Sequence, residues 1–182
     1  QDITMAQMVK DLDPKSLATV TVGTCSAYGG IPAARGNVTD SKSVRDFFAA
    51  EKIEKLLVNV PGCPPHPDWM VGTLVAAWSH VLNPKEHPLP ELDDEGRPML
   101  FFGENIHENC PYLDDYDNSN FAEIFTKPGC KAELGCKGPS TYADCYERLW
   151  NSGINWCVEN AVCIGCVEPD FPDGKSPFYV EE

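Results

Sequence analysis

The 182-residue chain is acidic and moderately apolar, and this composition limits what it can bind. Acidic residues number 28 against 14 basic ones, which gives a formal net charge of -14. A hydrophobic content of 42% supports a packed core and argues against wholesale disorder. The shortage of Lys and Arg argues against a nucleic-acid ligand. The acidic surplus either attracts a basic partner or only keeps the protein soluble.

No apolar run approaches the roughly 18 residues that suggest a membrane span. The best candidate, residues 69–82, is too short and contains His80. The N-terminal run QDITMAQMVKDLDPK has no apolar signal-peptide segment. We therefore expect no transmembrane segment, and the sequence contains no visible targeting signal.

The first half of the chain alternates between helical and strand patterns. Residues 3–11 suit a short helix, and the β-branched run 18–22 predicts a buried strand. After a Gly- and Pro-rich loop, Asp40 or Ser41 is positioned to cap a helix that extends to about residue 53. Residues 55–60 predict a second strand, and Pro67 suits the first turn of a helix over residues 68–82.

This order predicts a β–α–β unit with two parallel strands. Cys25 and Cys63 each follow the C-terminal end of a predicted strand. Ligands bind at that edge of open α/β sheets, so the two cysteines are expected to meet there. His66, in the turn after Cys63, is expected to be exposed or else to hydrogen-bond near a bound group; we favour exposure.

The pattern changes after about residue 84. Residues 83–98, NPKEHPLPELDDEGRP, predict a connecting loop, and little periodicity follows except a helix expected over residues 142–150. Phe101 and Phe102 are expected in the core. We predict an α/β domain over residues 1–84 and an irregular domain over residues 85–182.

Seven of the nine cysteines fall in this second part, where bound metal usually organises a thiol-rich segment. Spacing separates them into one set of a histidine with three cysteines and a second set of four cysteines. The first set is His107, Cys110, Cys130 and Cys136, and the second is Cys145, Cys157, Cys163 and Cys166. Iron–sulfur clusters, zinc sites and disulfides are all compatible with these residue types.

Five blocks resemble the small, electron-transferring subunit of nickel–iron hydrogenases. They are residues 23–33 (GTCSAYGGIPA), 61–67 (PGCPPHP), 107–112 (HENCPY), 133–139 (ELGCKGP) and 163–169 (CIGCVEP). The resemblance implies a flavodoxin-like first domain, represented here by its C-terminal part, and three iron–sulfur clusters in a row. Cys25 and Cys63 match half of the proximal ligands, and the Cys-x-x-Cys that supplies the other half is not in this sequence.

The resemblance further assigns the set containing His107 to a distal 4Fe–4S cluster, and Cys145, Cys163 and Cys166 to a medial cluster. Most members of the family have proline where this chain has Cys157, and they hold a 3Fe–4S cluster there. A fourth thiolate completes a 4Fe–4S cluster, as in the nickel–iron–selenium subgroup. We therefore hypothesise three 4Fe–4S clusters, with Cys157 as a ligand.

The implied function is electron transfer in the reversible oxidation of dihydrogen. The catalytic nickel–iron site belongs to a large partner subunit in a heterodimer, and no catalytic residue is expected in this chain. Electrons leave for a basic carrier such as a multihaem cytochrome c, and periplasmic localisation is implied by the subgroup. The alternatives are a zinc-binding interaction module and an iron–sulfur subunit of another redox complex.

Overall fold

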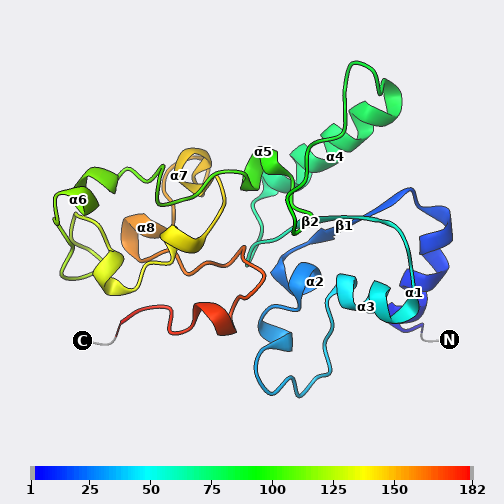
Figure 1. Cartoon of the computed structure of the whole chain (residues 1–182), viewed down its shortest axis with the longest axis horizontal. Helices are drawn as coiled ribbons and strands as arrows, with labels where there is room; N and C mark the ends of the chain where they lie inside the picture. Colours follow the sequence, from blue (N-terminus) through cyan, green and yellow to red (C-terminus); the bar gives the residue numbers. More distant parts are fainter. Residues whose placement is uncertain (1–2, 181–182) are drawn as a thin grey trace.

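The computed structural model describes residues 3–180. It has a sheet-containing part at the N-terminal side and an irregular part with short helices at the C-terminal side, as Figure 1 shows. The N-terminal part contains six helices and strands. They are α1 (Met5–Leu12), β1 (Ala18–Val22), α2 (Thr24–Tyr28), α3 (Val44–Glu51), β2 (Leu56–Val60) and α4 (Pro67–Leu82).

Strands β1 and β2 pair in parallel, as the sequence predicted. Ala18 lies opposite Leu56, and the register runs to Val22 opposite Val60. Side chains near the carboxyl ends of the strands are buried, among them Val60 and Asn59. Buried Asn59 accepts a hydrogen bond from Thr21 Oγ1 (2.7 Å) and donates Nδ2 to the Glu95 carbonyl (2.7 Å). The loop of residues 83–98 is thereby fixed against the sheet.

Helices α1, α3 and α4 begin where polar side chains cap them, whereas α2 has no side-chain cap. Ser43 Oγ accepts the Asp46 N–H at 3.0 Å, and α3 starts at Val44. The caps expected at Asp40 or Ser41 are wrong, because these residues belong to the preceding turn, in which Asp40 has a φ of 51°. Helix α2 lies where the sequence predicts only a loop, and it begins directly after β1 at Thr24.

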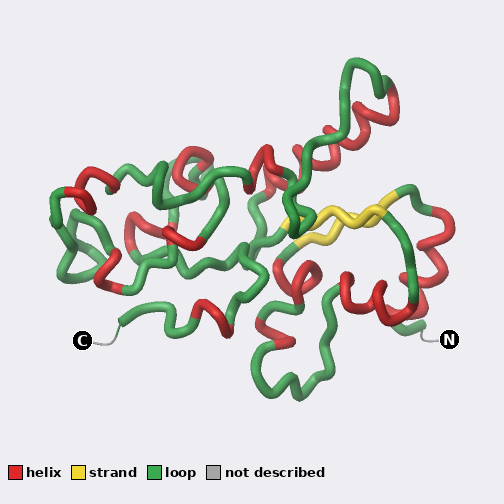
Figure 2. Tube along the Cα trace, viewed as in Figure 1, coloured by secondary structure: helices red, strands yellow, loops and turns green. Residues whose placement is uncertain are grey.

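The C-terminal part contains four short helices among turns, and Figure 2 shows how much of it is loop. They are α5 (Met99–Phe102), α6 (Leu113–Asp117), α7 (Cys145–Arg148) and α8 (Cys157–Asn160). Short 3-10 turns complete the described residues, η1 (Asp13–Lys15), η2 (Ile31–Ala33), η3 (Ala132–Leu134), η4 (Gly138–Ser140) and η5 (Asp173–Lys175).

The prediction of a helix over residues 142–150 is wrong, since only the single turn α7 forms. Tyr142 N–H donates to Glu168 Oε1 (2.8 Å) and Asp144 N–H donates to the Phe101 carbonyl (3.0 Å), so both amides are bound to distant segments. Leu149 then ends the turn with a φ of 59°. Long-range contacts therefore override the local helical pattern.

One buried core crosses the boundary expected near residue 84. Val60 and Trp69 come from the N-terminal part, and Phe102, Trp156 and Val167 from the C-terminal part. Phe101 and Phe102 are buried, which confirms the expectation for these two residues. The Trp69 and Phe102 rings lie 5.0 Å apart, at a tilt of 56°. Aromatic pairs of this kind contribute about 0.5–1.5 kcal/mol beyond the area they bury.

None of the helices within residues 3–180 combines the length and the apolarity that a bilayer crossing requires.

Replacing Phe102 by Ala is expected to lower the free energy of unfolding by about 3–5 kcal/mol, because a buried aromatic ring is lost and a cavity remains. The matched control is Leu100→Ala in the same helix, where the side chain is 66% exposed. This control is expected to cost about 0.5 kcal/mol or less. Urea unfolding followed by tryptophan fluorescence measures both, and equal losses in the two variants would contradict this description of the core.

Candidate iron–sulfur centres

Cys25 and Cys63 lie at the same edge of the sheet. Cys25 is in the first turn of α2, directly after β1, and Cys63 follows the end of β2. The parallel register brings Val22 opposite Val60, so both cysteine loops leave the same end of the strand pair. Burial raises the pKa of the Cys63 thiol, and the charge of Cys25 raises it further. The two thiols therefore lie within electrostatic reach of each other.

Glycine keeps space free around Cys25. Gly30 has a φ of 52°, and a Cβ atom there would lie 3.0 Å from the Cys25 backbone nitrogen and 3.1 Å from its sulfur. Gly62, next to Cys63, has a φ of 139°, and its Cβ would lie 2.5 Å from Pro65 Cα. Neither position accepts a side chain without displacing the loop that carries the thiol.

The hydroxyl of Thr24 joins three cysteine-bearing segments. Its Oγ1 accepts the Gly62 N–H at 2.8 Å and donates to the Cys166 carbonyl at 2.5 Å. Thr24 itself precedes Cys25 and is 1% exposed. One buried hydroxyl thus holds the Cys25, Cys63 and Cys166 loops at a fixed mutual position.

The four-cysteine set converges on one cavity of about 230 Å³. The apolar side chains of Ile106, Trp150 and Val167 also contribute to its wall. The thiols that line it are those predicted as a set, Cys145, Cys157, Cys163 and Cys166, and Cys63 joins them from the N-terminal part. The Cys63 and Cys166 loops therefore approach each other at this cavity.

The thiols in this cavity alter one another's pKa values. Burial raises the pKa of Cys166 to about 11 and also raises that of Cys145. A hydrogen bond between the Cys157 and Cys163 thiols raises the pKa of Cys157 and lowers that of Cys163. Four thiolates so close together repel one another, and a bound cationic group offsets that repulsion.

The histidine-containing set also converges. His107, Cys110, Cys130 and Cys136 line one narrow cavity of about 20 Å³, together with Tyr112 and Lys131. Buried Asn105 positions the start of this segment, since its Oδ1 accepts the His107 N–H at 2.8 Å. The His107 ring packs edge-on against Tyr116, with ring centroids 4.6 Å apart. Burial raises the pKa of Cys136 to about 11.

The space between the four thiols suits an inorganic group larger than one ion. Tetrahedral zinc holds its sulfur ligands at about 2.3 Å, which leaves no space for a water-sized sphere among them. Within residues 3–180, no three His, Cys, Asp or Glu side chains lie at the spacing of a single-ion site. All nine cysteines are free thiols, so the disulfide alternative is wrong for this structure. Four thiols around a cavity of about 230 Å³ fit an iron–sulfur cluster.

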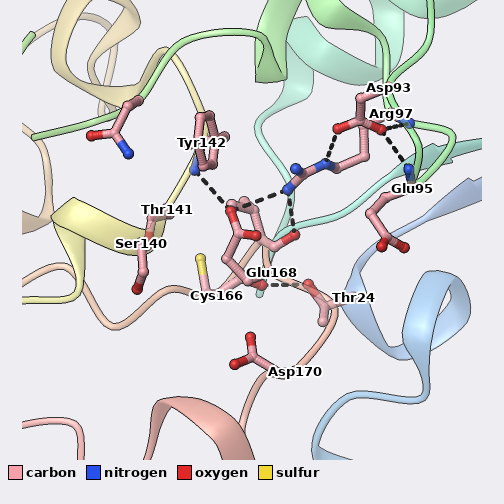
Figure 3. A network of polar contacts seen from close by, with 12 residues as sticks. Thr24, Asp93, Glu95, Arg97, Ser140, Thr141, Tyr142, Cys166, Glu168 and Asp170 are labelled. Atoms are coloured by element: carbon pink, nitrogen blue, oxygen red, sulfur yellow. Dashed lines mark hydrogen bonds and ion pairs between the residues drawn. The ribbon is translucent and has the colours of Figure 1, made fainter. Parts of the chain in front are cut away.

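A buried ion-pair network lies next to the Cys166 loop, as Figure 3 shows. Arg97 donates Nε to Asp93 Oδ2 (2.7 Å) and Nη1 to Glu168 Oε1 (3.1 Å). Burial disfavours the Arg97 charge, but the carboxylates of Glu168 and Asp93 outweigh it and raise the Arg97 pKa. Breaking a buried pair of this kind typically costs about 3–5 kcal/mol. The network fixes the loop of residues 83–98 to the segment that carries Cys166.

His66 is not exposed, contrary to the expectation that we favoured. Its Nδ1 accepts the Asp68 N–H at 3.1 Å and caps α4, while Nε2 bonds to the Leu149 carbonyl at 2.9 Å. The ring packs against Trp150, with centroids 4.8 Å apart. The signal was the position of His66 directly before Pro67, because a residue there can cap the helix.

Sequence reasoning also missed Thr24, Arg97 and Glu168. Thr24 adjoins Cys25 in the sequence, but it does not cap α2, and no local pattern marks its contacts with the Cys63 and Cys166 loops. Nothing local marks the pairing of Arg97 with Glu168, which are 71 residues apart. These residues hold the cysteine loops in position without carrying sulfur.

Two family models match this chain. Residues 102–179 match the model that describes the C-terminal region of the NiFe/NiFeSe hydrogenase small subunit. Residues 1–77 match the model described as NADH ubiquinone oxidoreductase, 20 Kd subunit.

Individual relatives agree with the first of these models. The periplasmic NiFeSe hydrogenase small subunit of Desulfomicrobium baculatum is 87% identical over 181 residues, which is 100% of this chain and 58% of that protein. The periplasmic NiFe hydrogenase small subunit 1 of Nitratidesulfovibrio vulgaris is 43% identical, with 97% of this chain and 55% of that protein covered. The chain thus spans between half and two thirds of the length of these relatives.

The fold of this chain also matches that of a solved hydrogenase structure. A chain of the Desulfomicrobium baculatum NiFeSe hydrogenase superposes with a TM-score of 0.96 at 86% identity, covering 100% of this chain and 65% of that one. Sequence and structure therefore agree, and the chain belongs to the family of NiFe and NiFeSe hydrogenase small subunits.

Proposed function

We propose that this chain is the electron-transfer part of a nickel–iron(–selenium) hydrogenase, an oxidoreductase that reversibly oxidises dihydrogen. The observation that carries the proposal is the convergence of two sulfur-rich donor sets on two neighbouring cavities in a chain of this family. The chain has no role in splitting hydrogen itself. It relays electrons between a partner subunit and an external acceptor.

The residues that line the two cavities support the following assignment of cluster ligands. We assign a medial 4Fe–4S cluster to Cys145, Cys157, Cys163 and Cys166, and a distal 4Fe–4S cluster to His107, Cys110, Cys130 and Cys136. Cys25 and Cys63 supply two of the four ligands of a proximal cluster. When bound, such clusters accept and pass on single electrons.

The protein around the thiols excludes water and sets the electrostatic field. Ile106 lies between the two cavities and lines both of them. Apolar Ile164 and Val167 line the four-thiol cavity beside Cys163 and Cys166, and Val167 is buried. Burial and hydrogen bonds to sulfur are the means by which a protein tunes cluster potentials.

The missing half of the proximal site is assigned to a segment outside these 182 residues, the N-terminal part of the small subunit. The two-stranded sheet supports this assignment, because parallel sheets are normally covered on both faces and extended beyond two strands. The side of α4 that faces away from the core is also apolar. Val71, Leu74, Val75, Trp78, Val81 and Leu82 are exposed there at helical spacing.

The partners follow from the family. We propose a heterodimer with a hydrogenase large subunit that contains the nickel–iron site. We also propose a periplasmic location, which the names of two relatives support. The net charge of -14 favours a basic acceptor such as a multihaem cytochrome c. The match of residues 1–77 to a respiratory subunit reflects the sheet-containing part alone.

Purification of the native complex followed by metal analysis tests the function. We expect a large subunit to co-purify, and iron, inorganic sulfide and nickel to be present, with hydrogen-dependent reduction of an artificial electron acceptor. A colourless protein that contains zinc and no inorganic sulfide would contradict the proposal and support the alternative of a zinc module.

Replacing Cys157 by Pro tests the nuclearity of the medial cluster. Cys157 is the first residue of α8, where proline is tolerated, so the fold is expected to persist. The oxidised variant is expected to show a 3Fe–4S EPR signal of about one spin per chain, because three thiolates remain. The matched control, Asn160→Ala in the same helix, is expected to show no such signal. A 3Fe–4S signal of full intensity in the unmodified protein would instead exclude Cys157 as a ligand.

A further inference from the structure

Lys131 is a buried lysine in the wall of the His107 cavity. It is 2% exposed and follows Cys130, and its side chain lines the cavity of the His107 set. Lysine is almost never fully buried unless its charge is compensated. We therefore expect a group close to Lys131 that compensates its positive charge.

The contacts of Lys131 compensate its charge only in part. Nζ donates to the Val158 carbonyl at 2.6 Å and lies 5.0 Å from the centre of the Tyr112 ring. Among residues 3–180, no ion pair includes Lys131. One carbonyl and one aromatic face leave a buried ammonium without an anionic partner from the protein.

The charge of Lys131 lies close to residues of both donor sets. Lys131 adjoins Cys130 of the histidine-containing set in the sequence. Its ammonium reaches Val158, which follows Cys157 of the four-thiol set and lines the histidine-containing cavity as well. An anionic group bound between His107 and the three thiols would therefore lie next to the ammonium of Lys131.

We propose that Lys131 supplies the compensating positive charge for the distal iron–sulfur cluster and raises that cluster's reduction potential. The inference rests on the proposed function, because it takes the His107 set to bind a cluster. Reduction adds one electron and no proton, so the group next to Lys131 becomes one unit more negative. A buried positive charge stabilises that form more than the oxidised form, since low dielectric strengthens the attraction.

Lys131 could instead act only as a tether between its own loop and α8. Two neutral variants separate charge from tethering: Lys131→Met keeps the length of the side chain, and Lys131→Gln also keeps a hydrogen-bond donor. Lys131→Arg keeps the charge. The matched control is Lys127→Met, which removes an exposed lysine from the same loop, where solvent screens the charge.

The experiment is a redox titration of the intact hydrogenase complex with a chemical reductant. Pulsed EPR follows the cluster coupled to an imidazole nitrogen, which makes the measurement specific for the His107 set. Both neutral variants are expected to lower the reduction equilibrium constant at least tenfold, about 59 mV for a one-electron couple. The Arg variant and the Lys127 control are expected to stay close to the unmodified complex.

Several results would overturn the proposal. An unchanged potential in the Met and Gln variants excludes the electrostatic role, and an Arg variant that shifts as far as Met indicates tethering. Loss of the cluster in both neutral variants indicates a role in assembly rather than in tuning. Absence of iron–sulfur signals from the unmodified complex is a different result, because it contradicts the proposed function itself.

Discussion

The hydroxyl of Thr24 is the interaction on which the relative placement of the cysteine loops depends. It accepts a hydrogen bond from the Cys63 loop and donates one to the carbonyl of Cys166, a residue 142 positions away. A buried donor or acceptor left without its partner costs about 1–3 kcal/mol, so each loop holds the others in place. The proposed electron relay would require fixed separations between centres, and this buried hydroxyl holds the Cys25, Cys63 and Cys166 loops together.

The C-terminal part shows how a segment with little regular structure keeps a single conformation. Its helices are one or two turns long, and its amides are bound across the chain, as in the pairing of Tyr142 with Glu168. Arg97, Lys131 and Lys175 place positive charges in or near this interior. The pKa values of Cys145, Cys157 and Cys166 are raised, while that of Cys163 is lowered. In the proposed assignment, iron together with these lysine and arginine charges would offset the negative charge of the thiolates. If the clusters bind as proposed, folding of this part is coupled to cluster binding.

The sequence predicted the elements that local patterns determine. β1, β2 and α4 lie within two residues of the expected bounds, since β-branched runs and Pro67 mark them. The grouping of the ligands by spacing also agrees with the two cavities. The single turn α7 and the helix cap at His66 were not predicted, because Glu168, Phe101 and Leu149 determine them from distant parts of the chain. The contacts of Thr24 and Arg97 also join distant parts of the chain, and the local sequence does not identify their partner residues.

The central claim is that the converging thiols and one imidazole enclose inorganic clusters. Diffraction from crystals of the native complex at the iron absorption edge tests it most directly. We expect separate anomalous peaks inside the Cys145–Cys166 cavity and inside the His107–Cys136 cavity, and another beside Cys25 and Cys63. Peaks that appear only at the zinc edge, or cavities with no anomalous scatterer and cysteines joined as disulfides, would contradict it.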